Sequence, residues 1–390
     1  MSLKETIYAF SVPCFAIMLF VPIPLFLASI PLGLLAIALV FDHQHRQIDS
    51  ADWSVFFLVL CFIAAVFNSS DILKSAHAFS LICSGLIIYF FFRSGIKSSL
   101  AYLPIFSGLL SIFVTSRIFI ALSNNGERNP QAAIERLSCS GLVVPNDFFF
   151  FILIMPFTFL LIYSDRRNSE RLIGIVSVLM TLAVAYLLES RLCILGGVIA
   201  SLFFLFFKNP RWVIPASGAL VLGFLSIDLA NDFAMSKKFY LLVEHNTRVG
   251  IWWVATKSFL TAPILGNGPA TFSSEYMEHL PLLQAQSWAA VDDRVITWAH
   301  NLFFEALSER GSLGFLSLAL LMLNSLRLGF KNRRTNSGLA LLCCLTLFWL
   351  GSLFEFTLSR VWVAPTLLFF AALVCLENQD SAGGRQPRKA

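Results

Sequence analysis

Hydrophobic residues in this chain gather in long runs, and short polar segments separate most of them. Each run approaches the roughly 20 residues that an α-helix needs to cross the hydrocarbon core of a bilayer. Twelve runs can be marked, at 7–21, 23–41, 53–67, 72–92, 99–122, 147–164, 172–189, 191–207, 212–229, 300–328, 338–355 and 360–376. The pattern therefore predicts an all-α polytopic membrane protein with about twelve transmembrane helices.

One long polar excursion interrupts this pattern and divides the chain. Residues 1–229 carry the predicted helices 1–9, residues 230–299 form a large loop outside the membrane, and residues 300–376 carry the predicted helices 10–12. The tail at 377–390 is polar, and its composition predicts disorder. Within the large loop, the sequence Ser236–Leu260 predicts a helix.

Two further signals complete the layout. The stretch Pro263–Pro269 combines proline and glycine and is expected to end the loop helix. A shorter polar loop, Ser123–Asn146, has room for a short helix of its own. Lysine and arginine concentrate in the short loops on the side of the two termini, which assigns the termini and the tail to the cytoplasm. Both polar loops then face the outer side of the membrane.

Composition narrows the class of protein. Hydrophobic residues make up 57% of the chain and charged residues only 13%, far from the values of a soluble domain. We find no basic tract interleaved with aromatic residues, so no nucleic-acid partner is expected, and membrane lipids are the expected surroundings. Nearly all of the cysteines lie in apolar runs, and no Cys/His spacing resembles a zinc site. We therefore expect neither a disulfide framework nor a bound metal.

The segment Trp298–Gly314, where the large loop re-enters the membrane, is the richest in candidate chemistry. At helical spacing, five of its residues share one face: His300, Phe304, Leu307, Gly311 and Gly314. This face is expected to present an imidazole at its outer end and two glycines that let another backbone approach closely. Four polar residues share the opposite face: Asn301, Glu305, Ser308 and Ser312. Polar groups at the mouth of a membrane helix are costly unless they line a wet cavity.

Two arginines are expected on the same side as His300. Arg191 follows a break too short to be a full loop, and Arg248 lies in the large loop. A guanidinium group offers fixed, bidentate donors that match a phosphate or diphosphate. The alternatives are local: Arg191 can extend to the membrane surface or pair with Glu189, a loop arginine is usually solvated, and a single histidine is more often structural.

Three motifs follow one another in the second half of the chain. They are Arg191-x-x-x-Leu195, then Thr247-Arg248 with Pro263-x-x-Gly266-x-Gly268, and finally His300-Asn301 followed after nine residues by Gly311-x-x-Gly314. In order and spacing they resemble the signatures of the O-antigen ligase and polymerase superfamily. The resemblance covers roughly residues 172–330. In its protein-glycosylating branch two threonines tend to follow the second glycine, whereas this chain has Phe315 and Leu316.

The resemblance implies a GT-C-like fold in the bacterial inner membrane, with the large loop and the active site in the periplasm. It implies transfer of a glycan from undecaprenyl diphosphate to a lipid A-core oligosaccharide, with inversion at the anomeric carbon and without metal or other cofactor. Arg191 and Arg248 would bind the diphosphate of the donor, and His300 would act as general base or orient the acceptor hydroxyl. Four residues are second-tier candidates: Asn301, Glu305, Glu309 and Arg310.

Two other functions stay open at this point. A polymerase of the same superfamily usually carries two long outer loops, whereas this chain has one long and one short, which favours the ligase. A transporter of lipid-linked sugars, a different class, would place ionisable groups near the middle of the bilayer and often shows repeat symmetry. Here the charged candidates gather at the outer rim, and the two halves show no repeat.

Overall fold

A computed structural model describes most of the chain, and its described residues form helices without strands. The described residues are 48–93, 98–123, 145–163, 167–230, 233, 236–237, 240, 247–291, 296–358, 360 and 362–383. The predicted spans at 7–21 and 23–41 lie outside these ranges, as does the short helix expected within the Ser123–Asn146 loop.

Eight helical segments of the described chain are long and apolar enough to cross a membrane. They contain α3 (Ser50–Phe67), α4 (Ile72–Arg93), α5 (Ser98–Ser123), α7 (Phe149–Tyr163), α8 (Asn168–Leu187), α9 (Arg191–Lys208), α10 (Val213–Ala230) and α14 (Leu302–Asn332). Two shorter apolar stretches lie in α15 (Asn336–Ser352) and α16 (Val363–Gly383). The chain is therefore a multi-pass membrane protein. Its later predicted runs coincide with these helices, while a total of twelve spans stays a prediction.

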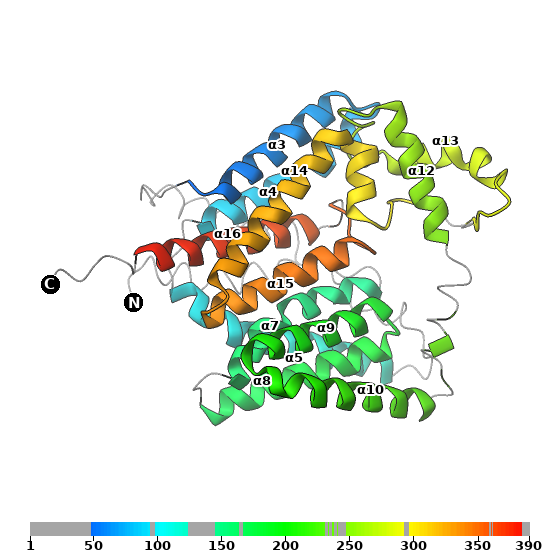
Figure 1. Cartoon of the computed structure of the whole chain (residues 1–390). Helices are drawn as coiled ribbons and strands as arrows, with labels where there is room; N and C mark the ends of the chain where they lie inside the picture. The colour runs from blue at the N-terminus through cyan, green and yellow to red at the C-terminus, as the bar shows by residue number, and fades with distance from the viewer. Residues whose placement is uncertain are drawn as a thin grey trace.

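The helices form two groups that α15 joins (Figure 1). In the view of Figure 1, α3, α4, α14 and α16 lie above, and α5 and α7 to α10 lie below. α15 packs on α14 and α16 on one side and on α7 and α9 on the other. A helix that is apolar all round is buried, and α7 follows this rule, since Phe149–Leu161 is buried throughout. α10 packs mainly on α9 and leaves most of its apolar side chains exposed.

The C-terminal helix is longer than the hydrophobic pattern predicts. α16 continues to Gly383, into the segment where the sequence predicts a disordered tail. The first of these residues, Glu377 and Asn378, are buried and have polar partners. The Thr335 hydroxyl donates to the Glu377 carboxylate at 2.7 Å, and the Asn378 amide donates to Asp49 at 3.4 Å. These bonds compensate the burial of polar groups and keep this turn of the helix against its neighbours.

The large loop contains a small helical lobe with a hydrophobic cluster of its own, drawn at the right of Figure 1. α12 (Thr247–Thr261) and α13 (Phe272–Gln284) enclose this cluster, which includes Ile251, Val254 and Phe272. The helix predicted over Ser236–Leu260 is confirmed for its second half, and the proline- and glycine-containing stretch ends it as expected.

A turn from this lobe is inserted into a kink of α14. At Gly311 the backbone leaves the helical conformation (φ 63°, ψ −163°), which interrupts the internal hydrogen bonds of the helix. The turn replaces them in both directions. The N–H groups of Ser312 and Leu313 donate to the carbonyls of Pro263 and Ile264, at 2.8 and 3.3 Å. In return, the carbonyls of Ser308 and Glu309 accept from Asn267 and Gly268, at 3.1 and 2.9 Å.

The kink changes the interpretation of the glycine motif. Gly311 does allow another backbone to approach, but that backbone is the turn at Ile264 and not a second helix. Because the kink breaks the 3.6-residue period, the predicted common face from Phe304 to Gly314 does not continue through Gly311. Gly314 instead leaves room for the side chain of Arg310 on the same helix.

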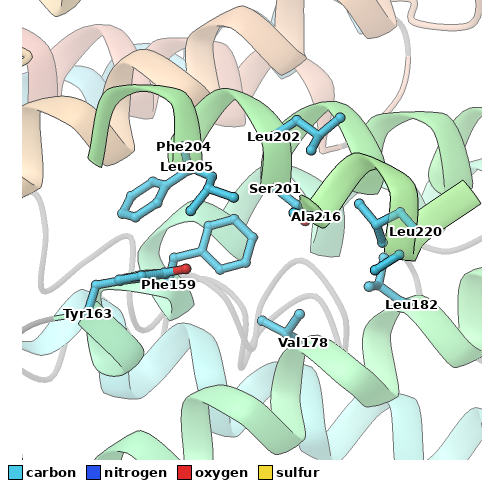
Figure 2. A pocket seen from close by; sticks show the side chains of 11 residues that line it. Phe159, Tyr163, Val178, Leu182, Ser201, Leu202, Phe204, Leu205, Ala216 and Leu220 are labelled. Atoms are coloured by element: carbon cyan, nitrogen blue, oxygen red, sulfur yellow. The ribbon is translucent and has the colours of Figure 1, made fainter. Parts of the chain in front are cut away.

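A separate apolar cavity of about 360 Å³ lies among α7, α8, α9 and α10 (Figure 2). Aromatic and aliphatic side chains from these four helices line it, among them Phe159, Val178, Phe204 and Leu220. Its polar groups are hydroxyls such as that of Tyr163, and no charged side chain lines it. The cavity therefore offers no charged group to a ligand.

The kink yields a prediction. Gly311→Ala is expected to destabilise the protein by about 1–3 kcal/mol, because its φ and ψ lie in a region that only glycine adopts readily. A Cβ there would also collide with the Ile264 carbonyl. Gly218→Ala in α10 is the matched control, because a Cβ there meets no atom within 4 Å. The measurement is thermal unfolding in detergent. An equal melting temperature for Gly311→Ala and Gly218→Ala would refute the account of the kink.

Candidate active site

At one end of the helices, three cationic or titratable side chains contact one buried carboxylate. Glu355 lies between α15 and α16, and its side chain is only 4% exposed. Its Oε2 accepts from the Arg248 guanidinium at 3.0 Å and lies 3.3 Å from Nδ1 of His300. Its Oε1 accepts from Arg360 at 2.8 Å. A single carboxylate therefore joins α12, the start of α14 and the segment before α16.

Arg360 is held on several sides. Besides Glu355, it donates to Oδ1 of Asp147 at 2.5 Å, and the indole of Trp362 donates to the same oxygen at 3.0 Å. The Arg360 guanidinium also lies over the ring of Trp298, 4.8 Å from the centroid. Asp147 precedes α7, so this arginine connects a fourth segment to the cluster. With two carboxylates bound, Arg360 is suited to neutralise buried charge and hold the segments together.

His300 lies before α14 and not on it, contrary to the helical face expected from the sequence. Asn301 is the N-cap of the helix, and its side-chain oxygen accepts from the N–H groups of Phe303 and Phe304. The N-cap is the boundary residue at which a helix begins, so His300, which precedes it, lies outside the helix. There it adopts a positive φ of 50°, which is uncommon for a residue with a side chain. The N-cap amide of Asn301 also donates to the Leu353 carbonyl at 2.8 Å, which fixes this entry against the Glu355 segment.

Aromatic contacts support the position of His300. The Trp298 indole N–H donates to Nδ1 of His300 at 3.2 Å. Trp252 donates to the Ala299 carbonyl at 3.1 Å and stacks on Phe304, with ring centroids 5.4 Å apart. The backbone on both sides of His300 is thus fixed to α12, the helix that carries Arg248. The side chains of His300 and Arg248 each remain 23% exposed, so a ligand can reach both.

Arg191 completes the cluster from a fifth segment. It is the first residue of α9, and the preceding Ser190 caps that helix and donates to the Asn146 side chain at 2.7 Å. Arg191 lies near enough to Arg248 for their positive charges to repel each other. Two half-buried guanidinium groups in this relation favour an anion between them. The structure thus brings together the three residues that the sequence singled out: Arg191, Arg248 and His300.

The environment of Glu355 keeps it ionised. Burial raises the pKa of this carboxyl group, but the contact with His300 and the positive charges of Arg360 and Arg248 together lower it by more. The net effect is a pKa below the ordinary value of 4.5. Near neutral pH, Glu355 is therefore a fixed negative charge that faces the imidazole.

The second-tier candidates lie deeper, under the surface of the cluster. Glu305, Glu309 and Arg310 are all at most 2% exposed. Glu305 accepts from the Thr357 hydroxyl at 2.6 Å, and Glu309 accepts from the Phe272 N–H at 3.4 Å. This placement favours a role in fixing the inserted turn and the Glu355 segment against α14 over contact with a substrate.

Sequence reasoning missed three residues of the cluster: Asp147, Glu355 and Arg360. Each is a charged residue at the end of an apolar run, a position that also suits an ordinary membrane anchor. Apart from the Glu355–Arg360 pair, their partners lie far away along the chain, and Asp147 is 213 residues from Arg360. The only sequence signal for these residues is therefore a charge at the end of an apolar run, and this signal does not show which residues form ion pairs.

Part of this cluster lies in a segment that matches a known protein family. Residues 175–319 match the family O-Antigen ligase. The matched segment contains Arg191, Arg248 and His300 and confirms the resemblance to the ligase and polymerase superfamily. Glu355 and Arg360 lie beyond its C-terminal end, and Asp147 lies before its start. A search of curated proteins found no match for the chain.

Within the described ranges, no three histidine, cysteine, aspartate or glutamate side chains are grouped so as to hold a metal ion. Positive charge in the cluster comes from guanidinium groups, which are always protonated in proteins.

The charge of Glu355 yields a prediction about pH. The folded protein lowers the pKa of Glu355, so its ionised form stabilises the fold above the ordinary pKa, and this contribution is lost as the pH falls through the lower folded value. Glu355→Gln removes the charge at every pH and should cost about 3–5 kcal/mol near neutrality, because Arg360 and Arg248 lose the buried negative charge that they bind. The melting temperatures of wild type and variant should converge below pH 4.5. A gap that does not depend on pH would contradict this assignment.

Proposed function

We propose that this protein is an O-antigen ligase, a glycosyltransferase that moves a glycan from undecaprenyl diphosphate to the lipid A-core oligosaccharide. The observation that carries the proposal is the convergence of Arg248 and His300 on Glu355, beside Arg191, in a segment that matches the O-Antigen ligase family. The excess of basic residues in the short loops at the opposite ends of the helices supports a periplasmic site in the bacterial inner membrane.

Arg191 and Arg248 are the proposed ligands of the donor diphosphate. They come from different segments, stand close enough to repel each other and are partly exposed. A diphosphate between them would relieve that repulsion and accept several charge-assisted hydrogen bonds. Since negative charge on the diphosphate grows as the sugar leaves, the same contacts strengthen in the transition state.

His300 is the proposed general base. When Nδ1 carries the proton and donates a hydrogen bond to the Glu355 carboxylate, the lone pair of Nε2 can accept the proton of the acceptor hydroxyl. The acceptor oxygen then forms a bond to the anomeric carbon while the bond from that carbon to the diphosphate oxygen breaks. Undecaprenyl diphosphate leaves with the electron pair, and the negative charge of Glu355 stabilises the imidazolium. Attack opposite the leaving group inverts the anomeric carbon.

The arginines and His300 are tested by substitution. Arg191→Lys and Arg248→Lys keep the charge but lose the bidentate fork, and each should lower glycan transfer by about thirty- to a thousandfold, equivalent to about 2–4 kcal/mol. His300→Ala should lower it about a hundredfold or more. The measurement is transfer by membranes that contain equal amounts of each protein. Near-normal transfer by both lysine variants would exclude bidentate recognition of the diphosphate.

The choice between ligase and polymerase needs its own experiment. Purified protein should move preassembled glycan from undecaprenyl diphosphate to lipid A-core in detergent, because the ligase takes the core sugar as acceptor. A polymerase would instead lengthen the undecaprenyl-linked glycan when the core is absent. A deletion strain should lose long chains on lipid A while it retains the undecaprenyl-linked polymer. Lipid A-core capped with a single repeat unit in that strain would identify a polymerase.

A further inference from the structure

Nδ1 of His300 faces a donor and an acceptor at nearly the same distance. The Trp298 indole N–H donates to Nδ1 at 3.2 Å, and Oε2 of Glu355 lies 3.3 Å from the same nitrogen. A neutral imidazole carries either a lone pair or a proton on this atom. With the lone pair it accepts from Trp298, and with the proton it donates to Glu355. The two contacts therefore belong to different tautomers of His300.

Two side chains also approach the same oxygen of the Glu355 carboxylate. Oε2 of Glu355 accepts from Arg248 at 3.0 Å, a shorter distance than that to His300. Oε1 is occupied by Arg360 at 2.8 Å, and Asp147 holds the other side of that arginine. Without a ligand, each carboxylate oxygen therefore already accepts from an arginine. His300 can then keep the tautomer that accepts from Trp298, in which Nε2 carries the proton.

We propose that diphosphate binding switches the tautomer of His300, with Glu355 and Trp298 as the positioning residues that define its two states. The proposal rests on the donor site proposed above. A diphosphate draws the Arg248 guanidinium away from Oε2 of Glu355. The vacated carboxylate oxygen then accepts a hydrogen bond from Nδ1–H of His300 in place of the one from Arg248, and the hydrogen bond from Trp298 is released. The base becomes available only when the donor is bound.

The proton balance of this switch is simple. Nε2 gives one proton to water, and Nδ1 takes one from water, so the imidazole stays neutral. The 23% exposure of the His300 side chain gives water access to the ring. During transfer, Nε2 accepts the proton of the acceptor hydroxyl, and the resulting imidazolium donates from Nδ1 to Glu355. The charged groups around the ring are Glu355, with Arg248 and Arg360 on its two oxygens, and Asp147 beyond Arg360.

The switch makes an unusual prediction for Glu355→Gln. The variant lacks the anion that competes for Arg248, so it should bind undecaprenyl diphosphate about three- to tenfold more tightly than wild type. It should also transfer glycan about a hundredfold more slowly at saturating donor, because an amide does not stabilise the imidazolium. Binding is measured by calorimetry in detergent. If Glu355 only holds Arg248 in place, binding weakens instead, and that result would overturn the proposal.

Trp298→Phe provides a second test that does not depend on the stability of Glu355→Gln. Phenylalanine keeps a ring under Arg360 but removes the N–H that holds the inactive tautomer. Because donor binding must break that hydrogen bond in wild type, the variant should bind undecaprenyl diphosphate about two- to fivefold more tightly. Trp253→Phe is the matched control, since Trp253 contacts Trp288 and Lys257 in the lobe. Unchanged or weaker binding by Trp298→Phe, with normal Trp253→Phe, would refute the switch.

Failure of the switch can be told from failure of the proposed function. If wild-type protein binds undecaprenyl diphosphate and transfers glycan, and Arg248→Ala loses both, the donor site stands. The binding of Glu355→Gln and Trp298→Phe then decides the switch alone. If wild-type protein neither binds the lipid diphosphate nor transfers glycan, the proposed function fails, and the switch fails with it.

Discussion

The burial of the Glu355 carboxylate is the constraint on which the arrangement of the site depends. An ionised carboxylate in a largely apolar structure is costly unless cations and hydrogen-bond donors surround it. Glu355 meets this requirement with Arg248, Arg360 and His300, and each comes from a different position along the chain. Arg360 extends the constraint to Asp147. Satisfying one buried charge thus sets the relative positions of α7, α12, α14 and α16 at this end of the helices.

A second constraint brings α12 to that end. The turn after α12 supplies the hydrogen bonds that α14 gives up at Gly311, so the lobe and the helix complete each other. The same turn donates and accepts at four backbone positions, and any shift would leave buried N–H and C=O groups without partners. The stacking of Trp252 on Phe304 adds a side-chain contact between the same two helices. Arg248 and His300 are therefore held within reach of one carboxylate, although they lie far apart in the sequence.

The hydrophobic pattern predicted most of the described helices, because a membrane span must be long, apolar and helical to satisfy its backbone. The pattern also predicted that Arg191, Arg248 and His300 lie at the same end of the helices. It could not predict that His300 precedes α14, since the capping role of Asn301 and the kink at Gly311 depend on contacts with Leu353 and Ile264. Nor could it reveal Glu355, because a glutamate at the end of an apolar run is equally compatible with a surface anchor, and only the fold shows its three partners.

The central claim is that the guanidinium groups beside Glu355 form a diphosphate site. The most direct test is a cryo-EM structure of the protein in nanodiscs with undecaprenyl diphosphate bound. We expect the diphosphate between Arg191 and Arg248, with the Arg248 guanidinium on a phosphate oxygen and His300 within hydrogen-bond distance of Glu355. A diphosphate bound elsewhere, with the Arg248–Glu355 ion pair intact, would contradict the account.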